Sequence, residues 1–268
     1  MVDNIRDIAA YYSRDPEREQ GRLAEHQLEF DLTWRFLERY LPERGDLLEV
    51  GAATGAYTLP LLKQGYLVTA VDLSWVQIRF CQDRAYQVGG DSKVCFLVSD
   101  ARFLALEKQP VYDAVLLMGP LYHLVEVTDR RRALHEAFLR LKPGGILFSS
   151  FISRLGILGD LMRNVPEWIE YQAEVDSLLT KGHDTVSASE NFRGYFVRAA
   201  EVPPLHESVG FETLELLGVE PAISADDESY NRLEGRQREL WLDLMARVSG
   251  EESILGASRH LLYVGKKP

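Results

Sequence analysis

The chain has 268 residues, 46% of them hydrophobic, and 41 acidic against 30 basic side chains, which leaves a net charge of −11. No apolar run approaches the ~18 residues of a membrane span, and the first residues, MVDNIRDIAAYY, lack the apolar core of a secretory signal, so membrane and secreted classes are disfavoured. Cys81 and Cys95 are too few for a disulfide framework and lack zinc-site spacing, so we expect two core thiols in a cytoplasmic protein. The acidic excess disfavours nucleic acid as a partner.

The first half of the chain alternates amphipathic helices with short apolar strands. Residues 22–41 repeat large apolar side chains at helical spacing, which predicts a helix that ends at Pro42. The strands expected after it are 47–50, 66–71, 94–98, 112–118 and 146–151, and the helices between them are 57–64, 74–88 and 129–141. Gly65 is expected just past the end of the first of these helices, and Ser74 is the expected N-cap of the second.

Strands without polar alternation, separated by helices, predict a parallel sheet that is covered on both faces, which is a doubly wound α/β fold. The pattern becomes mixed after Phe151 and returns to helix and strand in the last third. The later expected elements are a helix near 168–179, a helix at 204–210, and strands at 211–217 and 260–265. We therefore expect an N-terminal helical cap at 1–41 and one domain at 42–268, with cap insertions at about 152–200 and 220–257.

Small residues follow the first expected strand, in the run Glu49-Val50-Gly51-Ala52-Ala53-Thr54-Gly55. Small side chains let a ligand approach the backbone, and the N-terminus of the next helix offers N–H groups to a polar or anionic group. An ordinary turn between strand and helix would explain the glycines equally well.

An acid follows each of the next two expected strands. Asp72 lies 21 positions beyond Gly51, the spacing at which nucleotide-binding sheets place an acceptor for ribose hydroxyls. Asp100 follows the third strand, where a carboxylate could accept from an adenine amino group. Each acid could instead cap the next helix. Because ligands of open α/β sheets bind at the carboxyl ends of the strands, the three positions together favour a nucleoside-like ligand.

The glycine pattern narrows the choice of that ligand. A dinucleotide site needs G-x-G-x-x-G, and Ala53 stands where the second glycine would make room for a pyrophosphate. No P-loop string G-x-x-x-x-G-K-[ST] occurs either. A nicotinamide-dependent oxidoreductase and ATP chemistry are both disfavoured.

Five segments together resemble the class I S-adenosylmethionine-dependent methyltransferases, in particular the ubiquinone/menaquinone-methyltransferase-like set with a type 11 methyltransferase domain. The segments are LLEVGAATGAYTLPLLKQG (47–65), VTAVDLS (68–74), VSDAR (98–102), YDAVLLMGPLYHL (112–124) and LKPGGILF (141–148). The resemblance implies a Rossmann-like methyltransferase fold of seven mainly parallel strands with the last one antiparallel. The closing pair, 211–217 and 260–265, is consistent with that arrangement.

The resemblance also implies S-adenosyl-L-methionine as the cofactor and assigns its contacts. The loop from Gly51 through Ala52 and Ala53 to Gly55 would lie under the methionine part, and Glu49 would help to organise that end. The adenosyl part would contact Asp72 at the ribose, Leu73 beside the adenine, and Asp100 with Ala101 at the adenine.

Met118 and Gly119 would line the place where the sulfonium meets the methyl acceptor. Methyl transfer is an in-line displacement that needs alignment and exclusion of water rather than a covalent nucleophile. His123 is the histidine nearest that place, and it is either a general base or a packed histidine. Tyr12, beside Tyr11, either closes over the cationic sulfonium or packs at the sheet edge. The remaining histidines, 26, 135, 183, 206 and 260, show no metal-ligand spacing, so no metal site is predicted.

These observations predict a methyltransferase acting on a small-molecule acceptor. The alternatives are a tRNA- or rRNA-modifying methyltransferase, which would need a basic face beyond the single tight cluster Arg130–Arg132, and a non-catalytic cofactor-binding module. The Gly119-Pro120-Leu121-Tyr122 loop also departs from the Asn/Asp-Pro-Pro-Tyr/Phe motif of base-modifying methylases. Aromatic side chains in the two insertions predict either an apolar acceptor pocket or cap packing; they are Trp168, Tyr171, Phe192, Tyr195, Phe196, Tyr230 and Trp241.

Overall fold

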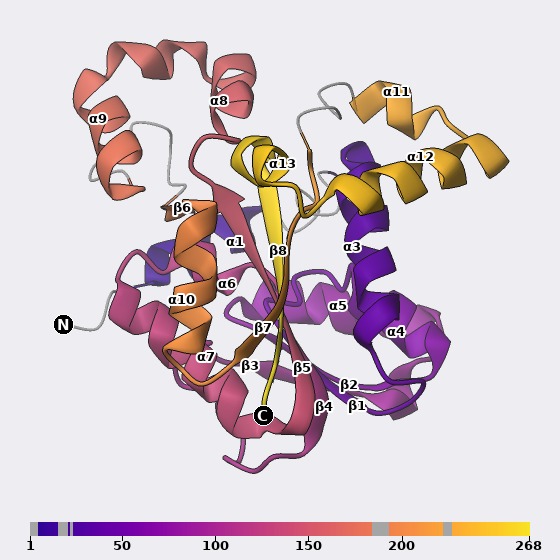
Figure 1. Cartoon of the computed structure of the whole chain (residues 1–268). Helices are drawn as coiled ribbons and strands as arrows, with labels where there is room; N and C mark the ends of the chain where they lie inside the picture. The colour runs from indigo at the N-terminus through magenta and orange to yellow at the C-terminus, as the bar shows by residue number, and fades with distance from the viewer. Residues whose placement is uncertain (1–4, 16–20, 22–23, 184–192, 222–226) are drawn as a thin grey trace.

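The computed structural model describes the chain apart from residues 1–4, 16–20, 22–23, 184–192 and 222–226 (Figure 1). Its centre is one sheet in which neighbouring strands follow the order β3-β2-β1-β4-β5-β8-β7. β6 is a further strand that pairs with β5 and lies outside this order. The strands are β1 Asp46–Val50, β2 Leu67–Asp72, β3 Val94–Val98, β4 Tyr112–Leu117, β5 Leu141–Ser153, β6 Phe196–Val197, β7 Glu212–Gly218 and β8 His260–Lys266. β8 runs antiparallel to both of its neighbours, while the other pairs are parallel, so the predicted doubly wound sheet with an antiparallel last strand is confirmed.

Helices cover both faces of this sheet (Figure 1). The α-helices are α1 Arg6–Arg14, α3 Gln27–Tyr40, α4 Thr58–Gln64, α5 Trp75–Gln87, α6 Pro120–His123, α7 Val127–Arg140, α8 Leu158–Asn164, α9 Gln172–Lys181, α10 Val202–Glu207, α11 Asp227–Asn231, α12 Gly235–Val248 and α13 Glu252–Ala257. The short 3₁₀ turns are η1 Asp91–Lys93, η2 Pro166–Glu170 and η3 Ala199–Glu201. None of the helices that the structure describes is long and apolar enough to cross a membrane.

Alternate residues along each strand enter two different cores, as the pleat of a strand requires. On one face Leu47 packs with α3 and α4, and on the other Leu48 packs with α7 and α10. The sequence of β1 therefore needs apolar side chains at both positions. This double burial explains why the strands lack polar alternation.

Local signals set several element boundaries. Gly65 ends α4 in the left-handed conformation, with φ at 97°, and Ser74 caps α5 by accepting from the backbone N–H of Gln77 at 3.3 Å. Both features confirm the sequence prediction. β5 is longer than the predicted 146–151, because Leu141 pairs with Tyr112 across an irregularity in the register before Ile146.

The prediction that both cysteines are core thiols is wrong for one of them. Cys81 is buried on α5, whereas Cys95 is exposed on β3. β3 is the edge strand of the sheet, so its side chains have fewer neighbours than those of central strands. Residues 184–192 of the predicted insertion at about 152–200 lie outside the described residues.

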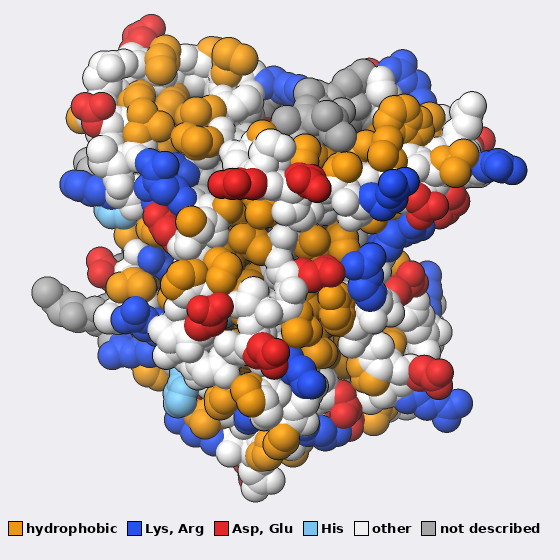
Figure 2. Space-filling view, viewed as in Figure 1, with side chains coloured by type: hydrophobic (Ala, Val, Ile, Leu, Met, Phe, Trp, Pro, Cys, Tyr) orange, Lys and Arg blue, Asp and Glu red, His pale blue; other side chains and the backbone are white. Residues whose placement is uncertain are grey.

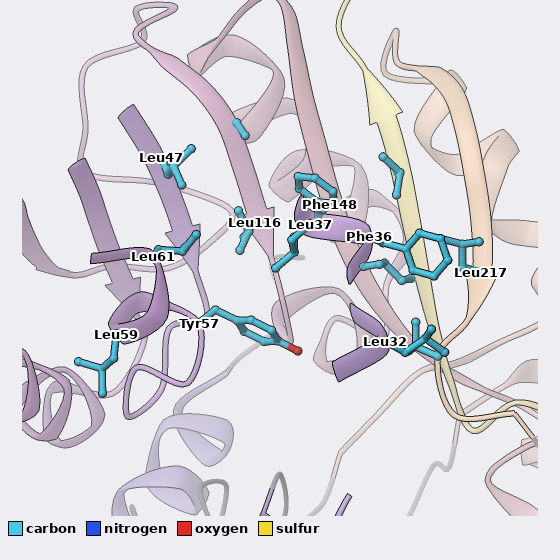
Figure 3. Close-up of a cluster of buried hydrophobic side chains, with 14 of the residues drawn as sticks. Leu32, Phe36, Leu37, Leu47, Tyr57, Leu59, Leu61, Leu116, Phe148 and Leu217 are labelled. Atoms are coloured by element: carbon cyan, nitrogen blue, oxygen red, sulfur yellow. The ribbon is translucent and has the colours of Figure 1, made fainter. Parts of the chain in front are cut away.

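The first core cluster depends on α3. Leu32, Phe36 and Leu37 are fully buried there and belong to one cluster, in which Leu37 lies beside Leu116 of β4 and Phe148 of β5 (Figure 3). Leu37→Ala should lower the free energy of unfolding by about 2–5 kcal/mol, because it removes buried methyl groups and leaves a cavity. Leu240→Ala on α12, where the side chain is 55% exposed, should change it by less than about 0.5 kcal/mol. Urea unfolding of both variants measures the difference, and equal losses would show that α3 is not a core helix.

Candidate functional site

A cavity lies at the carboxyl edge of the sheet, where the strand order changes direction between β1 and β4. Its empty volume is about 1110 Å³, part of which is open to solvent. The predicted site residues that line it are Tyr12, Glu49, Gly51, Ala52, Ala53, Asp72, Leu73, Asp100, Ala101, Met118, Gly119 and His123. Gly55 is the predicted site residue that does not line it. A side chain at Gly55 would instead meet the sulfur of Cys81 at 2.8 Å, so this glycine allows α5 to pack closely.

The turn after β1 is folded back against β2. The N–H of Gly51 donates to the Val71 carbonyl at 2.8 Å, and the N–H of Ala53 donates to Oδ2 of Asp72 at 2.9 Å. Gly51 has φ at 86°, and a Cβ there would lie 2.6 Å from the carbonyl oxygen of Met118. Glycine is therefore required at this position by both backbone conformation and space.

Asp72 holds the local backbone by hydrogen bonds and also forms part of the cavity wall. While Oδ2 accepts from Ala53, Oδ1 accepts from the N–H of Ser74 at 2.8 Å. Burial raises the pKa of Asp72, and these backbone donors oppose the rise. The two interpretations of this acid, turn residue and ligand acceptor, are thus compatible, because a carboxylate has about four lone-pair positions.

Glu49 is buried beneath the turn, where its carboxyl accepts a hydrogen bond from Oγ1 of Thr58. Burial raises the pKa of Glu49 to about 8, and the nearby Asp72 carboxylate adds to the rise. Glu49 therefore carries a proton at neutral pH when no cation is close to it.

Asp100 is held by a neighbouring guanidinium. Arg102 reaches its carboxylate with Nη2 at 2.8 Å and extends Nη1 to Asp129 at 2.6 Å. Arg102 is itself buried, so the pair fixes the loop after β3. This contact keeps the backbone of Asp100 and Ala101 at the cavity wall.

The N-terminal helix covers the cavity. Ile8 and Tyr12 of α1 line it, and the Tyr12 carbonyl accepts from Nε2 of Gln77 on α5 at 2.8 Å. Ser13 and Ser74 share a further hydrogen bond of 2.8 Å between their hydroxyls. Two contacts thus attach α1 to the start of α5, beside Asp72.

His123 connects α6 to this covering helix. Its Nε2 lies 2.8 Å from the Tyr12 hydroxyl, and its Nδ1 lies 2.9 Å from the Arg193 carbonyl. Burial lowers the pKa of His123 to about 4, so the ring is neutral at pH 7. Its contacts are those of a packed histidine that also borders the cavity.

The far end of the cavity contains residues that the sequence analysis missed, namely Glu29, Ser150 and His260. Carboxylate oxygens of Glu29 and Glu220 and a ring nitrogen of His260 lie within 4.8 Å of one another. Arg259 contributes a guanidinium to the same group through its contacts with Glu220. No sequence spacing could reveal the group of Glu29, Glu220 and His260, because its members come from α3, from the segment after β7 and from β8. The absence of a metal stays a prediction.

The aromatic side chains of the insertions do not form the wall of this cavity, within the part of the chain that the structure describes. Tyr171 and Trp241 are about half exposed, and Tyr230 is buried against α3, where it donates to Asp31 at 2.8 Å. Phe192 lies outside the described residues. Exposed hydrophobic side chains instead gather on the two lobes built by α8 with α9 and by α11 with α12 (Figure 2).

The charge of the cavity wall restricts what can bind. Among the described residues the wall has four carboxyl groups, those of Glu29, Glu49, Asp72 and Asp100, and it has no Lys or Arg. Although Glu49 is protonated and Asp100 is paired with Arg102, such a wall offers a phosphate no Lys or Arg side chain, whereas the Asp72 carboxylate favours a ligand with a positive charge and vicinal hydroxyls. S-adenosylmethionine, with its sulfonium, ammonium and ribose groups, fits this set of donors and acceptors.

Comparison with known proteins agrees with this conclusion. A family model described as a methyltransferase domain matches residues 47–145. A Bacillus subtilis protein named as a methyltransferase, YqeM, is 31% identical over 120 residues, and the matched region spans 44% of this chain and 47% of that protein. The 27-O-demethylrifamycin SV methyltransferase of Amycolatopsis mediterranei is 27% identical over 234 residues, which covers 85% of this chain and 80% of the relative.

A solved structure supports the fold independently. It is an S-adenosylmethionine-dependent methyltransferase from Methanosarcina mazei, with a TM-score of 0.61 at 20% identity, covering 87% of this chain and 96% of that one. At this identity the likeness shows the fold alone. The domain match and the relatives support a class I S-adenosylmethionine-dependent methyltransferase with S-adenosylmethionine as its cofactor, and the fold is consistent with it.

Proposed function

We propose that this methyltransferase transfers the methyl group to a small-molecule acceptor that binds in the far end of the cavity. The observation that supports it is the continuity of one cavity past the predicted cofactor residues, from Met118 and Gly119 to Ser150 and His260. A covered cavity of this kind suits a small ligand better than a macromolecule. One relative, which matches 85% of this chain, is named for a small-molecule acceptor, 27-O-demethylrifamycin SV.

The cofactor would be held at the other end. Glu49 and the turn from Gly51 to Ala53 would hold its methionine part, and Asp72 with Leu73 its ribose and adenine. When bound, S-adenosylmethionine supplies a methyl group on a positively charged sulfur. The chain would contribute alignment through this turn and exclusion of water through α1, so that proximity and desolvation provide most of the rate.

The structure offers little support for an RNA substrate. Of the Arg130–Arg132 cluster, Arg130 is buried, donates to the Leu124 carbonyl at 2.6 Å and lies 3.6 Å from the centre of the Tyr195 ring. Arg132 pairs with Asp129 at 3.2 Å. One of the three guanidinium groups is therefore buried, and a second, though exposed, is paired with a carboxylate, which weakens a basic face at this cluster.

The division into a cap at 1–41 and a methyltransferase domain at 42–268, with insertions at about 152–200 and 220–257, stays a proposal. α1 is consistent with a cap because it covers the cavity, while α3 packs in the main core. A cytoplasmic location likewise remains what the composition predicts.

The pKa of Glu49 predicts a pH-dependent affinity for the cofactor. Since a cation beside Glu49 favours the carboxylate, binding should release its proton below pH 8, the free-state pKa. The dissociation constant should therefore fall by up to about tenfold per pH unit as pH rises from 6 to 8 and then level off. Titration calorimetry in buffers of different ionisation enthalpy would count the released proton. Glu49→Gln serves as the control, because the ligand still titrates in that experiment while residue 49 no longer does. An identical pH dependence of the dissociation constant in both proteins would contradict the proposed role of Glu49.

His123 gives a second prediction. Its replacement by asparagine should weaken S-adenosylmethionine binding by about three- to tenfold, because the contact that holds Tyr12 over the cavity is lost. Turnover at saturating cofactor should change much less, since a ring with a pKa of about 4 is a weak base at neutral pH. A hundredfold loss of turnover with unchanged affinity would identify His123 as the base instead.

The acceptor class can be tested by label transfer. The full chain, incubated with methyl-labelled S-adenosylmethionine, should label compounds in a low-molecular-weight metabolite extract and leave total RNA unlabelled. Asp72→Ala should remove this labelling because it loses cofactor contacts, and its cofactor affinity is measured alongside. Label in RNA alone would favour the RNA alternative, and binding without any transfer would favour the non-catalytic module.

A further inference from the structure

His260 lies at the acceptor end of the cavity because of the direction of its strand. Ser150 of β5 pairs with Leu262 of β8, so His260 lies two residues nearer the carboxyl edge, about 6.6 Å farther along. β8 is antiparallel to β5, so its first residue falls at the edge where the parallel strands end. Met118 follows β4, the strand on the other side of β5. The histidine therefore faces the same cavity as the predicted reaction centre.

A carboxylate fixes the orientation of this histidine. Nδ1 of His260 bonds to Oε2 of Glu220, and Oε2 of Glu29 lies 3.6 Å from the same nitrogen. Glu220 is buried, its Oε2 accepts from Nε of Arg259 at 2.9 Å, and its own N–H donates to Oγ of Ser258 at 3.0 Å. A carboxylate on Nδ1 selects the tautomer in which Nε2 accepts a proton.

The charges around His260 come from several elements. Glu29 belongs to α3, Glu220 follows β7, and Arg259 precedes β8. Arg259 also contacts His26 at 2.9 Å and Asp160 of α8 at 2.6 Å. Three carboxylates face one guanidinium, so the surroundings stabilise the imidazolium that forms when the ring accepts a proton, and they disfavour a carboxylate-bearing acceptor.

We propose that His260 is the general base that accepts the proton of a hydroxyl acceptor, with Glu220 as its positioning residue. This inference rests on the proposed small-molecule function and specifies its substrate class: an uncharged or cationic compound with a phenolic or alcoholic hydroxyl. The acceptor oxygen forms a bond to the methyl carbon while the carbon–sulfur bond breaks. The electron pair of that bond stays on sulfur, giving the neutral thioether S-adenosylhomocysteine, and the hydroxyl proton passes to Nε2 of His260 and then to water.

The first test needs no turnover. Carbon-13 histidine NMR of the full chain measures the pKa of the His260 ring, with His260→Gln used for assignment. Glu220→Gln should lower this pKa by about one unit or more, because the imidazolium loses its carboxylate, and Glu220→Asp should restore most of the difference. An unchanged pKa in Glu220→Gln would overturn the positioning role.

The second test follows kinetics with catechol, phenol and 3,4-dihydroxybenzoate as acceptor probes. His260→Gln should reduce kcat by about a hundredfold or more, with the dissociation constant of S-adenosylmethionine within about threefold of the wild-type value. Glu220→Gln should move the acidic limb of the pH profile by the shift seen in NMR. His135→Gln, an exposed histidine on α7, is the matched control and should keep wild-type kcat. Circular dichroism verifies the fold of each variant.

The outcomes separate the two proposals. A His260→Gln variant that keeps its fold and loses less than about fivefold in kcat would overturn the base. Transfer to amines but to none of the phenols, or a preference for 3,4-dihydroxybenzoate over catechol, would overturn the acceptor class and leave the small-molecule function standing. Label found only in RNA would overturn both.

Discussion

Buried carboxyl groups at one edge of the sheet are the constraint on which the site depends. Glu49 and Asp72 are removed from water beneath and beside the first turn, and burial raises the pKa of both. Such burial is unfavourable unless hydrogen bonds or a cation compensate for it. Backbone N–H groups of Ala53 and Ser74 compensate Asp72, and the Thr58 hydroxyl partly compensates Glu49. The remaining demand for positive charge is what a sulfonium cofactor meets.

The same carboxylate of Asp72 also shapes the turn that receives the ligand. Because it accepts from Ala53, it draws the glycine turn toward the end of β2, and because it accepts from Ser74, it sets the start of α5. Ser74 in turn contacts Ser13 on the covering helix. One polar network thus joins the turn, the second strand and α1, so the cavity wall and the helix that covers it are structurally connected.

Two parts of the chain build the two ends of the cavity. The strands from β1 to β4 supply the proposed cofactor end, and the antiparallel β8 brings His260 to the proposed acceptor end. The two histidines of the cavity differ in their surroundings. Burial keeps the His123 ring neutral although the Arg193 carbonyl opposes this effect, whereas the His260 ring is bonded to the Glu220 carboxylate, which stabilises an imidazolium once one forms.

The sequence alone determined the α/β alternation, the strand positions and the cofactor end of the site. These features are local, since apolar strands, a cap such as Ser74 and a glycine turn leave their signal within a few residues. The resemblance then supplied the cofactor and the expected role of Asp72 as a ligand acceptor. Composition and spacing had left the choice between ligand acceptor and helix cap open.

Only the tertiary structure decided the acceptor end. Glu29, Glu220 and His260 are far apart along the chain, and they meet because α3 packs on the sheet and β8 runs against its neighbours. The structure also showed that Gly55 packs against Cys81 and that the aromatic side chains of the insertions leave the cavity wall to other residues. Contacts between distant segments depend on packing in three dimensions, which periodicity along one chain does not record.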